Sequence, residues 1–316
     1  MLSCFVGIDV SKAILDVALW PERTVFQVSN DTTGHMALIA RLSDLKVERI
    51  LLEATGGYEK RVLYSLLQAG LPAVCINPVR ARQYARAVGL KAKTDKIDAL
   101  LLGQFAGQLD MQTPPAPSEE RRALDELVKL RDAFVQQRDD NKRRRLQATL
   151  PVAIESYEQS IGYLQDQIKR VEKLINQAAL ALNRPLAEQL MAVKGLGPVT
   201  VANLMAYLPE LGQMGRRQVA AMVGVAPYNN DSGKHTGKRQ IHGGRGKLRR
   251  VLYMCAWVMV RFNDDFKARY EVLRASGKVA KVALVACMRM LIVRLNAMVR
   301  DGTAWNANVT TEGTTA

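Results

Sequence analysis

The chain has 316 residues, 48% hydrophobic and 24% charged, which is ordinary for a globular protein with room for two or three domains. Its 45 lysines and arginines exceed its 30 aspartates and glutamates, so the formal net charge is +15, which favours nucleic acid or an anionic membrane surface as a partner. We expect no membrane span, because no run of eighteen apolar residues occurs, and the four scattered cysteines argue against a zinc site or a disulfide framework.

The first 112 residues alternate between strand-like and helix-like patterns. Short runs rich in β-branched and aromatic residues predict strands, expected in chain order at 3–9, 14–20, 23–29, 47–53 and 72–77. Helical spacing of apolar residues separates the last three strands, and two further helices follow them. This order, three strands and then alternating helices and strands, predicts a ribonuclease H-like fold for residues 1–112.

Two of these strands end in acids, and the last helix begins with two more. Asp9 ends the first strand and Glu53 the fourth, and in a ribonuclease H-like sheet these strands are neighbours. Asp95 and Asp98 stand at the start of a helix expected to pack beside the same sheet edge. Four such carboxylates would repel one another unless Mg²⁺ or Mn²⁺ neutralised them, and two such ions suit phosphodiester chemistry. Taken singly, each acid has an ordinary alternative as a helix cap or a turn residue.

A proline-rich stretch, MQTPPAPSEE, marks a domain boundary. Residues 113–185 are predicted to form a helical spacer, with apolar residues at alternating spacings of three and four from Ile154 to Ala178. This heptad pattern is typical of a coiled coil, whose partner helix belongs either to this chain or to another copy. Three consecutive arginines, Arg143, Arg144 and Arg145, are candidates for contact with a nucleic-acid backbone or for an ordinary solvent face.

Residues 186–302 form a third section. The stretch LMAVKGLGPVTVANLMAYL predicts two helices joined by a tight glycine turn, a helix-hairpin-helix-like segment suited to phosphate binding. Residues 228–250 then combine glycines with seven basic residues that we expect to contact phosphates, namely Lys234, Lys238, Arg239, Arg245, Lys247, Arg249 and Arg250. Two helices are expected at about 247–262 and 278–300, and residues 303–316 are expected to be a disordered tail.

Sequence blocks in both halves of the chain resemble one family. GIDVSKAILDVAL, LLEATGGYEK, INPVRARQYARA and KTDKIDALLL, and later VKGLGPVTVANLMA and NDSGKHTGKRQIHGGRGKLRR, look like successive motifs of the DEDD-type insertion-sequence transposases of family 110. The related Piv/MooV DNA invertases carry similar blocks. The resemblance implies a RuvC-like catalytic domain, whose four acids correspond to Asp9, Glu53, Asp95 and Asp98. It also implies a C-terminal transposase domain in which Ser232 is the nucleophile that attacks DNA.

The same resemblance implies a reaction and its partners. DNA strands would be cleaved through a covalent phosphoserine link, exchanged and religated. An RNA transcribed from the element itself would pair with donor and target DNA. Exchange between two duplexes suggests a homodimer or homotetramer, acting in the bacterial cytoplasm at the nucleoid.

Three alternatives remain open from the residues. A Holliday-junction resolvase would use the acids alone, without serine chemistry, and a non-catalytic scaffold would only bind nucleic acid. GIDVSKAILDVAL also resembles the phosphate-binding hairpin of actin-like sugar kinases. That fold requires a second such hairpin and a glycine-rich adenosine loop, and we find neither in the sequence.

Overall fold

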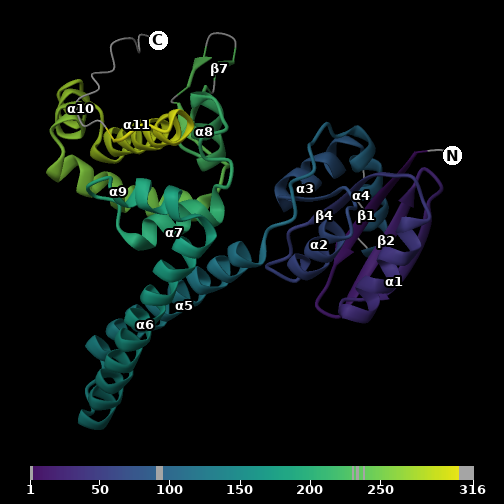
Figure 1. The fold of residues 1–316 in the computed structure, drawn as a ribbon, viewed down its shortest axis with the longest axis horizontal. Coiled ribbons are helices and arrows are strands. Elements are labelled where there is room, and N and C mark those ends of the chain that lie inside the picture. The colour runs from purple at the N-terminus through teal and green to yellow at the C-terminus, as the bar shows by residue number, and fades with distance from the viewer. Residues whose placement is uncertain (1–2, 90–94, 230, 233–234, 238, 306–316) are drawn as a thin grey trace. The chain divides into compact units, whose positions relative to one another are not determined.

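The computed structural model describes residues 3–89, 95–229, 231–232, 235–237 and 239–305 (Figure 1). Of residues 95, 231, 232, 235 and 236 it describes the backbone alone. The chain divides into two compact units, an N-terminal unit, Met1–Pro117, and a C-terminal unit, Ser118–Ala316. The first contains a mixed sheet covered by helices, and the second is mainly helical.

The N-terminal unit is built on a five-stranded sheet with the order β3-β2-β1-β4-β5. Its strands are β1 (Cys4–Val10), β2 (Ile14–Trp20), β3 (Thr24–Ser29), β4 (Val47–Glu53) and β5 (Ala73–Ile76). The first three strands form an antiparallel meander, whereas β4 pairs in parallel with both β1 and β5. Parallel neighbours need crossover connections, which the helices between β3, β4 and β5 supply. A mixed α/β sheet in this part of the chain is therefore confirmed.

Four helices cover the sheet, and alternate residues of each strand point to opposite faces. They are α1 (Thr32–Ser43), α2 (Glu59–Gln68), α3 (Pro78–Ala87) and α4 (Asp95–Gln108). Val6, Ile8 and Val10 of β1 belong to an apolar core that includes residues of α1 and α2. Leu51 of β4 belongs to a second core, which it shares with residues of α3 and α4. One face is therefore packed by α1 and α2, and the other by α3 and α4.

Gly7 allows α4 to lie directly on β1. A Cβ atom added at Gly7 would stand 2.0 Å from the carbonyl oxygen of Ala99 and 2.2 Å from the backbone nitrogen of Gly103. No side chain fits in this space, because both neighbours are helix backbone. The closeness of β1 and α4 therefore depends on glycine at position 7.

We expect Gly7→Ala to lower the free energy of unfolding by about 3 kcal/mol, the upper part of the range for overpacked cores. The added methyl group must push α4 off the sheet, since backbone atoms have no rotamers with which to yield. Urea unfolding of the purified variant measures this. The matched control is Gly162→Ala, because a Cβ at Gly162 meets nothing within 4 Å and should stabilise its helix by about 0.5–1 kcal/mol. Equal stabilities of Gly7→Ala and wild type would contradict the packing described.

The C-terminal unit begins with two long helices that lie side by side (Figure 1), α5 (Glu119–Gln147) and α6 (Pro151–Met191). Nε of Arg131 on α5 donates to the Glu172 carboxylate on α6 at 2.8 Å. The predicted heptad positions from 164 to 175 are buried in α6. The partner helix is thus found in this chain. The helix α6 bends at Asn183, whose φ of −163° is not helical, two residues before Pro185.

The remaining helices share one apolar core with residues of α5 and α6. They are α7 (Pro198–Tyr207), α8 (Arg216–Val223), α9 (Gly246–Phe262), α10 (Asp264–Ala275) and α11 (Ala280–Asp301). By length and composition α11 would suffice to cross a membrane, but Leu284, Leu291 and Leu295 are fully buried inside this unit. The two helices predicted at about 247–262 and 278–300 are confirmed as α9 and α11, but the sequence analysis missed α10, which lies between them. Its sequence is largely polar and buries only Phe266 and Leu273, so its periodicity is weak.

Candidate active site

Asp9 and Glu53 lie at the same level of two neighbouring strands. Ile8 pairs with Leu52 in the parallel ladder of β1 and β4, and Asp9 and Glu53 are the next residue of each strand. Neighbouring strands are about 4.8 Å apart, and residues at one level point to one face. Because Leu51 faces α3 and α4, Glu53 two residues later faces that side as well. Both carboxylates therefore lie on the α4 face, at the carboxyl ends of their strands.

The direction of α4 brings its first turn to this end of the sheet. Gly107, near the end of α4, is placed so that an added Cβ would lie 3.3 Å from the Phe5 ring at the start of β1. An Arg49 guanidinium N–H, in the first half of β4, donates to the carbonyl oxygen of Ala106 at 2.8 Å. The end of α4 thus lies where β1 and β4 begin, and its start lies where they end. Asp95 and Asp98 belong to that first turn.

The acids have the donor chemistry of a divalent-cation site. All four are carboxylates, and oxygen ligands of this kind are preferred by Mg²⁺ and Mn²⁺. Asp9, Glu53 and Asp98 are partly buried, and one Asp9 oxygen accepts the Val10 N–H at 3.1 Å. Among the side chains that the structure describes, no three His, Cys, Asp or Glu residues approach closely enough to hold one ion. The side chain of Asp95 falls outside that description.

A fifth acid, Asp16, lies beside Asp9 and was not identified from the sequence. Asp9 and Asp16 are direct partners in the antiparallel ladder of β1 and β2, so their side chains share a face. Asp16 is only 5% exposed and accepts a hydrogen bond of 2.8 Å from Nε2 of Gln27 on β3. Its signal in the sequence is an acid inside the otherwise apolar strand ILDVALW.

Asn30 joins the two loops that follow the acid-bearing strands. Its Nδ2 donates to the Ser11 carbonyl oxygen at 2.8 Å, after β1, and to the Tyr58 carbonyl oxygen at 3.4 Å, after β4. In the second loop the buried Glu59 carboxylate accepts the Gly57 N–H at 2.8 Å. These contacts fix the loops that follow β1 and β4, the strands that carry Asp9 and Glu53 at their ends. They join segments far apart in sequence, so no local pattern reveals them.

Ser232 lies in a nested pair of short hairpins between α8 and α9. The four strands are β6 (Pro227–Tyr228), β7 (Asp231–Ser232), β8 (His235–Thr236) and β9 (Gln240–Ile241). The outer pair is β6 with β9, and the inner pair is β7 with β8, in which Ser232 is opposite His235. The sequence analysis predicted no strands in this segment. The acids belong to the N-terminal unit and Ser232 to the C-terminal unit.

The base of this serine hairpin (residues 224–245) is held together by close backbone contacts. A Cβ at Gly244 would stand 2.3 Å from the backbone nitrogen of Gly224, and both glycines have positive φ, which favours glycine. Nη1 of Arg249 donates to the carbonyl oxygen of Gly243 at 2.8 Å. The rings of Tyr228 and His242 stack with centroids 4.1 Å apart. The two chain segments that carry the hairpin are therefore joined at its base.

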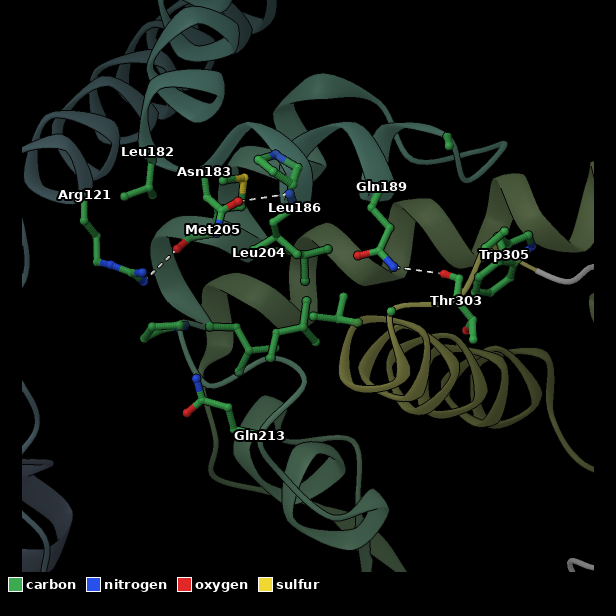
Figure 2. Close-up of a pocket in the computed structure, with 18 residues that line it drawn as sticks. Arg121, Leu182, Asn183, Leu186, Gln189, Leu204, Met205, Gln213, Thr303 and Trp305 are labelled. Atoms are coloured by element: carbon green, nitrogen blue, oxygen red, sulfur yellow. Dashed lines mark hydrogen bonds between the residues drawn. The ribbon is translucent and has the colours of Figure 1, made fainter.

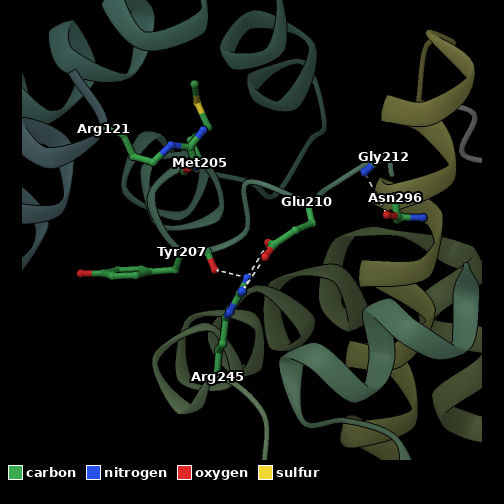
Figure 3. Close-up of polar contacts among 7 residues, drawn as sticks. All are labelled: Arg121, Met205, Tyr207, Glu210, Gly212, Arg245 and Asn296. Atoms are coloured by element: carbon green, nitrogen blue, oxygen red, sulfur yellow. Dashed lines mark hydrogen bonds and ion pairs between the residues drawn. The ribbon is translucent and has the colours of Figure 1, made fainter. Parts of the chain in front are cut away.

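An ion pair links the end of the hairpin to the loop after α7 (Figure 3). Both terminal nitrogens of Arg245 donate to the Glu210 carboxylate at 2.6 Å, and Nη1 also donates to the Tyr207 carbonyl oxygen at 2.8 Å. Burial alone would raise the pKa of Glu210, but the hydrogen bonds and charge of Arg245, with Arg121 nearby, hold that pKa below its ordinary value of 4.5. Glu210 is therefore charged at neutral pH and fixes Arg245.

We expect Glu210→Gln to lower the free energy of unfolding by about 1–2 kcal/mol at pH 7, because Arg245 loses its charged acceptor. The pKa of Glu210 is lower in the folded protein than its unfolded value of 4.5, so its charged form stabilises the fold at pH values above 4.5. This contribution disappears as the pH falls through the folded pKa. The difference between variant and wild type should thus shrink below pH 4.5, as urea titrations at several pH values would show. Glu188→Gln, in the exposed pair with Arg184, should change stability by less than about 0.5 kcal/mol. A difference that grows with acidity would contradict the assignment.

The structure divides the seven basic residues of 228–250 into different environments. Arg245 and Arg249 have internal acceptors, and Nζ of Lys247 donates to the Tyr207 hydroxyl at 3.2 Å. Arg239 and Arg250 are exposed. The other two, Lys234 and Lys238, lie outside the described residues. Sequence analysis treated all seven alike, because Glu210 and the glycine carbonyl groups are not recognisable as partners from the sequence.

The three arginines near the end of α5 also differ. Arg143 pairs with Asp140 on the same helix, and Arg145 pairs with Glu158 of α6, its Nε lying 2.8 Å from the carboxylate. Arg144 is exposed. Two of the three charges are therefore compensated within the helical pair.

A groove of about 1020 Å³ lies in the C-terminal unit at the bend of α6 (Figure 2). Arg121 and Gln189 are among its lining residues, and each donates to a backbone carbonyl, of Met205 at 2.9 Å and of Thr303 at 2.9 Å respectively. Most of the other lining residues are apolar. None of the described candidate residues lines this groove, so the proposed chemistry lies elsewhere.

Comparisons with known proteins match both parts of the chain. The family model for the DEDD transposases of IS110 matches residues 6–154, and that of the transposase IS116/IS110/IS902 family matches residues 187–271. The pilin gene-inverting proteins of Moraxella bovis and Moraxella lacunata are each 26% identical over 98% of this chain and 99% of their own length. An uncharacterized protein of insertion element IS110 from Streptomyces coelicolor is 27% identical over 64% of this chain and 48% of its own.

The two matched regions include the strand ends with Asp9 and Glu53, the helix α4, and the serine hairpin. Both family models describe transposases, and the relatives matched over their full length are named for the inversion of a pilin gene. The chain therefore belongs to the IS110 family of DEDD transposases and is a DNA-cleaving enzyme of transposition and recombination.

Proposed function

We propose that this transposase cleaves and rejoins DNA with a divalent cation held by Asp9, Glu53, Asp95 and Asp98, and with Ser232 as its nucleophile. The observation that carries the proposal is the register of β1 and β4 together with the direction of α4, because the strand ends with Asp9 and Glu53 and the first turn of α4 lie at the same end of the sheet. The strand order β3-β2-β1-β4-β5 supports a RuvC-like, ribonuclease H-like assignment for residues 1–112.

The proposed residues would have separate roles in the reaction. The Ser232 hydroxyl oxygen attacks the phosphorus, a new O–P bond forms, and the bond from phosphorus to the leaving deoxyribose oxygen breaks. The serine proton leaves and the departing oxygen gains one, so charge balances. A divalent cation, when bound, supplies Lewis-acid stabilisation of the phosphoryl oxygens. Arg239 in the serine hairpin and Arg250 on α9, both exposed, would neutralise flanking phosphates.

The covalent link explains how a recombinase can rejoin strands. One phosphoester is exchanged for another, so the energy of the original bond is retained in the phosphoserine. Attack by the hydroxyl of an exchanged strand reverses the step and releases Ser232. The need to rejoin the cleaved strand favours a serine nucleophile over water, because hydrolysis would leave a terminal phosphate monoester that cannot be rejoined without activation.

We extend the proposal to the remaining sections and partners. Residues 113–185 would form the spacer and 186–302 the transposase domain, with its glycine turn at 194–198 as a helix-hairpin-helix-like segment. The net charge of +15 suits donor and target DNA together with an element-encoded guide RNA, bound by a homodimer or homotetramer in the bacterial cytoplasm. Pilin gene inversion by the Moraxella relatives, as their names state, is a rearrangement of the same kind.

The test is to trap the covalent intermediate. Protein purified with its RNA is incubated with Mg²⁺ and a DNA duplex that carries an element end, quenched in denaturant and analysed by mass spectrometry. A peptide containing Ser232 joined to a nucleotide is the expected result. Cleavage without any adduct would establish a resolvase-type nuclease that uses water. DNA binding without cleavage would establish a scaffold.

A further inference from the structure

We propose that α3 is a phosphate-binding surface for the DNA strand that reaches the acid-bearing end of the sheet, with Arg82 and Arg86 as its principal contacts. This inference rests on the proposed function, since it names a partner surface for that site. Sequence analysis assigned no binding role to α3. Three observations carry it, on charge, exposure and position.

The charge of this segment has one sign. Residues 76–94 contain five lysines and arginines and no aspartate or glutamate. Three of the five, Arg80, Arg82 and Arg86, lie in the ten residues of α3. Arg82 and Arg86 are four residues apart and therefore neighbours on one helical face, where like charges repel. A polyanion removes that repulsion, whereas nothing within the helix does.

The arginines of α3 are exposed and uncompensated. Ala81 is the only buried residue of α3, and Arg80, Arg82 and Arg86 are exposed. In the part of the chain that the structure describes, no ion pair or hydrogen bond involves the side chain of Arg82 or Arg86, in contrast to Arg145, which has Glu158 as its partner. Both guanidinium groups therefore keep their donors for a ligand. Arginine donors match phosphate oxygens in geometry as well as in charge.

The helix α3 begins at the acid-bearing end of the sheet and runs away from it along α4. Ile76, the last residue of β5, pairs with Glu53, and Asn77 immediately after it caps α3 by accepting the Val79 N–H at 2.9 Å. The Tyr84 ring stacks on Phe105 of α4, with centroids 4.2 Å apart and planes 9° apart. A ten-residue helix is about 15 Å long, so its arginines lie within a few nucleotides of a phosphate at the acids. The strand cut at the acids is DNA, and we therefore commit to DNA as the occupant.

The experiment compares two double variants that remove the same charge. Arg82→Gln/Arg86→Gln alters α3, whereas Arg41→Gln/Lys46→Gln alters the end of α1 and the residue before β4, at the opposite end of the sheet. Affinity for a fluorescent duplex carrying an element end is measured without divalent metal at several salt concentrations, with the protein's RNA retained. Each lost phosphate contact lowers the slope of log K against log salt by about 0.9. We expect the α3 variant to lower this slope by about 2 and the control variant to leave it unchanged.

The outcomes separate this inference from the proposed function. Equal slopes for the α3 variant and wild type, with tight wild-type binding, overturn the inference and leave the proposed chemistry intact. Equal losses in both variants overturn it too, since the effect would then be bulk charge. A loss confined to binding of the isolated guide RNA also overturns it. Failure of wild type to bind any duplex overturns the proposed function itself. We expect Arg82→Gln/Arg86→Gln to unfold in urea at the same concentration as wild type, because both side chains are exposed. That result would show that the variant is folded and differs only at its surface.

Discussion

Replacing Asp9 by asparagine is expected to reduce strand cleavage by about 10³-fold or more, equivalent to about 4 kcal/mol of transition-state stabilisation. Asparagine keeps the shape of the side chain but removes the negative charge with which it would hold a cation. Asp9 lies one residue beyond the last paired residues of β1 and β4, so its backbone position should not change. DNA affinity should stay equal or rise, because one negative charge facing the substrate is lost.

Two measurements test this prediction. Single-turnover cleavage with Mg²⁺ gives the rate, and electron paramagnetic resonance of bound Mn²⁺ reports cation binding independently of activity. Asp44→Asn is the matched control, since Asp44 is an exposed acid at the end of α1, outside the acid set. It should match wild type in both assays. Full cleavage or full Mn²⁺ binding by Asp9→Asn would remove Asp9 from the proposed site.

Replacing Ser232 by alanine is expected to abolish the covalent protein–DNA adduct and to lower recombination by about 10⁴-fold or more, as for removal of other nucleophiles. Alanine lacks the hydroxyl oxygen that would attack phosphorus. The hairpin should persist, because Ser232 and His235 pair through their backbones and its base is held by Arg249 and Arg245. Mn²⁺ binding should be unaffected, since the acids are intact.

The readout is an adduct that resists denaturation, together with cleaved and rejoined DNA products on a sequencing gel. Ser156→Ala serves as the control, because Ser156 is an exposed serine on α6 without a proposed role. If Ser232→Ala still produces free cleaved ends and Asp9→Asn does not, the nucleophile is water and the resolvase alternative is correct. An adduct that survives in Ser232→Ala would place the nucleophile on another residue.

The sequence by itself determined features that depend on near neighbours in the chain. The alternation in CFVGIDV and VERILLE predicted β1 and β4 and placed Asp9 and Glu53 at or near their ends, because strand periodicity is a local property. The heptad spacing predicted the long helix α6 for the same reason, although it left the partner helix open. The motifs around the acids and Ser232 indicated the family, which the comparisons confirmed.

Only the tertiary structure decided which polar groups meet. Arg245 pairs with Glu210 across 35 residues, Asp16 adjoins Asp9 through strand pairing, and Asn30 joins two distant loops. The physical reason is that an ion pair or hydrogen bond needs an approach of about 3 Å, and folding brings distant segments that close without leaving a local pattern. The basic residues therefore look alike along the sequence. In the structure, Arg245 has an internal acidic partner, whereas the side chains of Arg82 and Arg86 are exposed and form no ion pair with any residue that the structure describes.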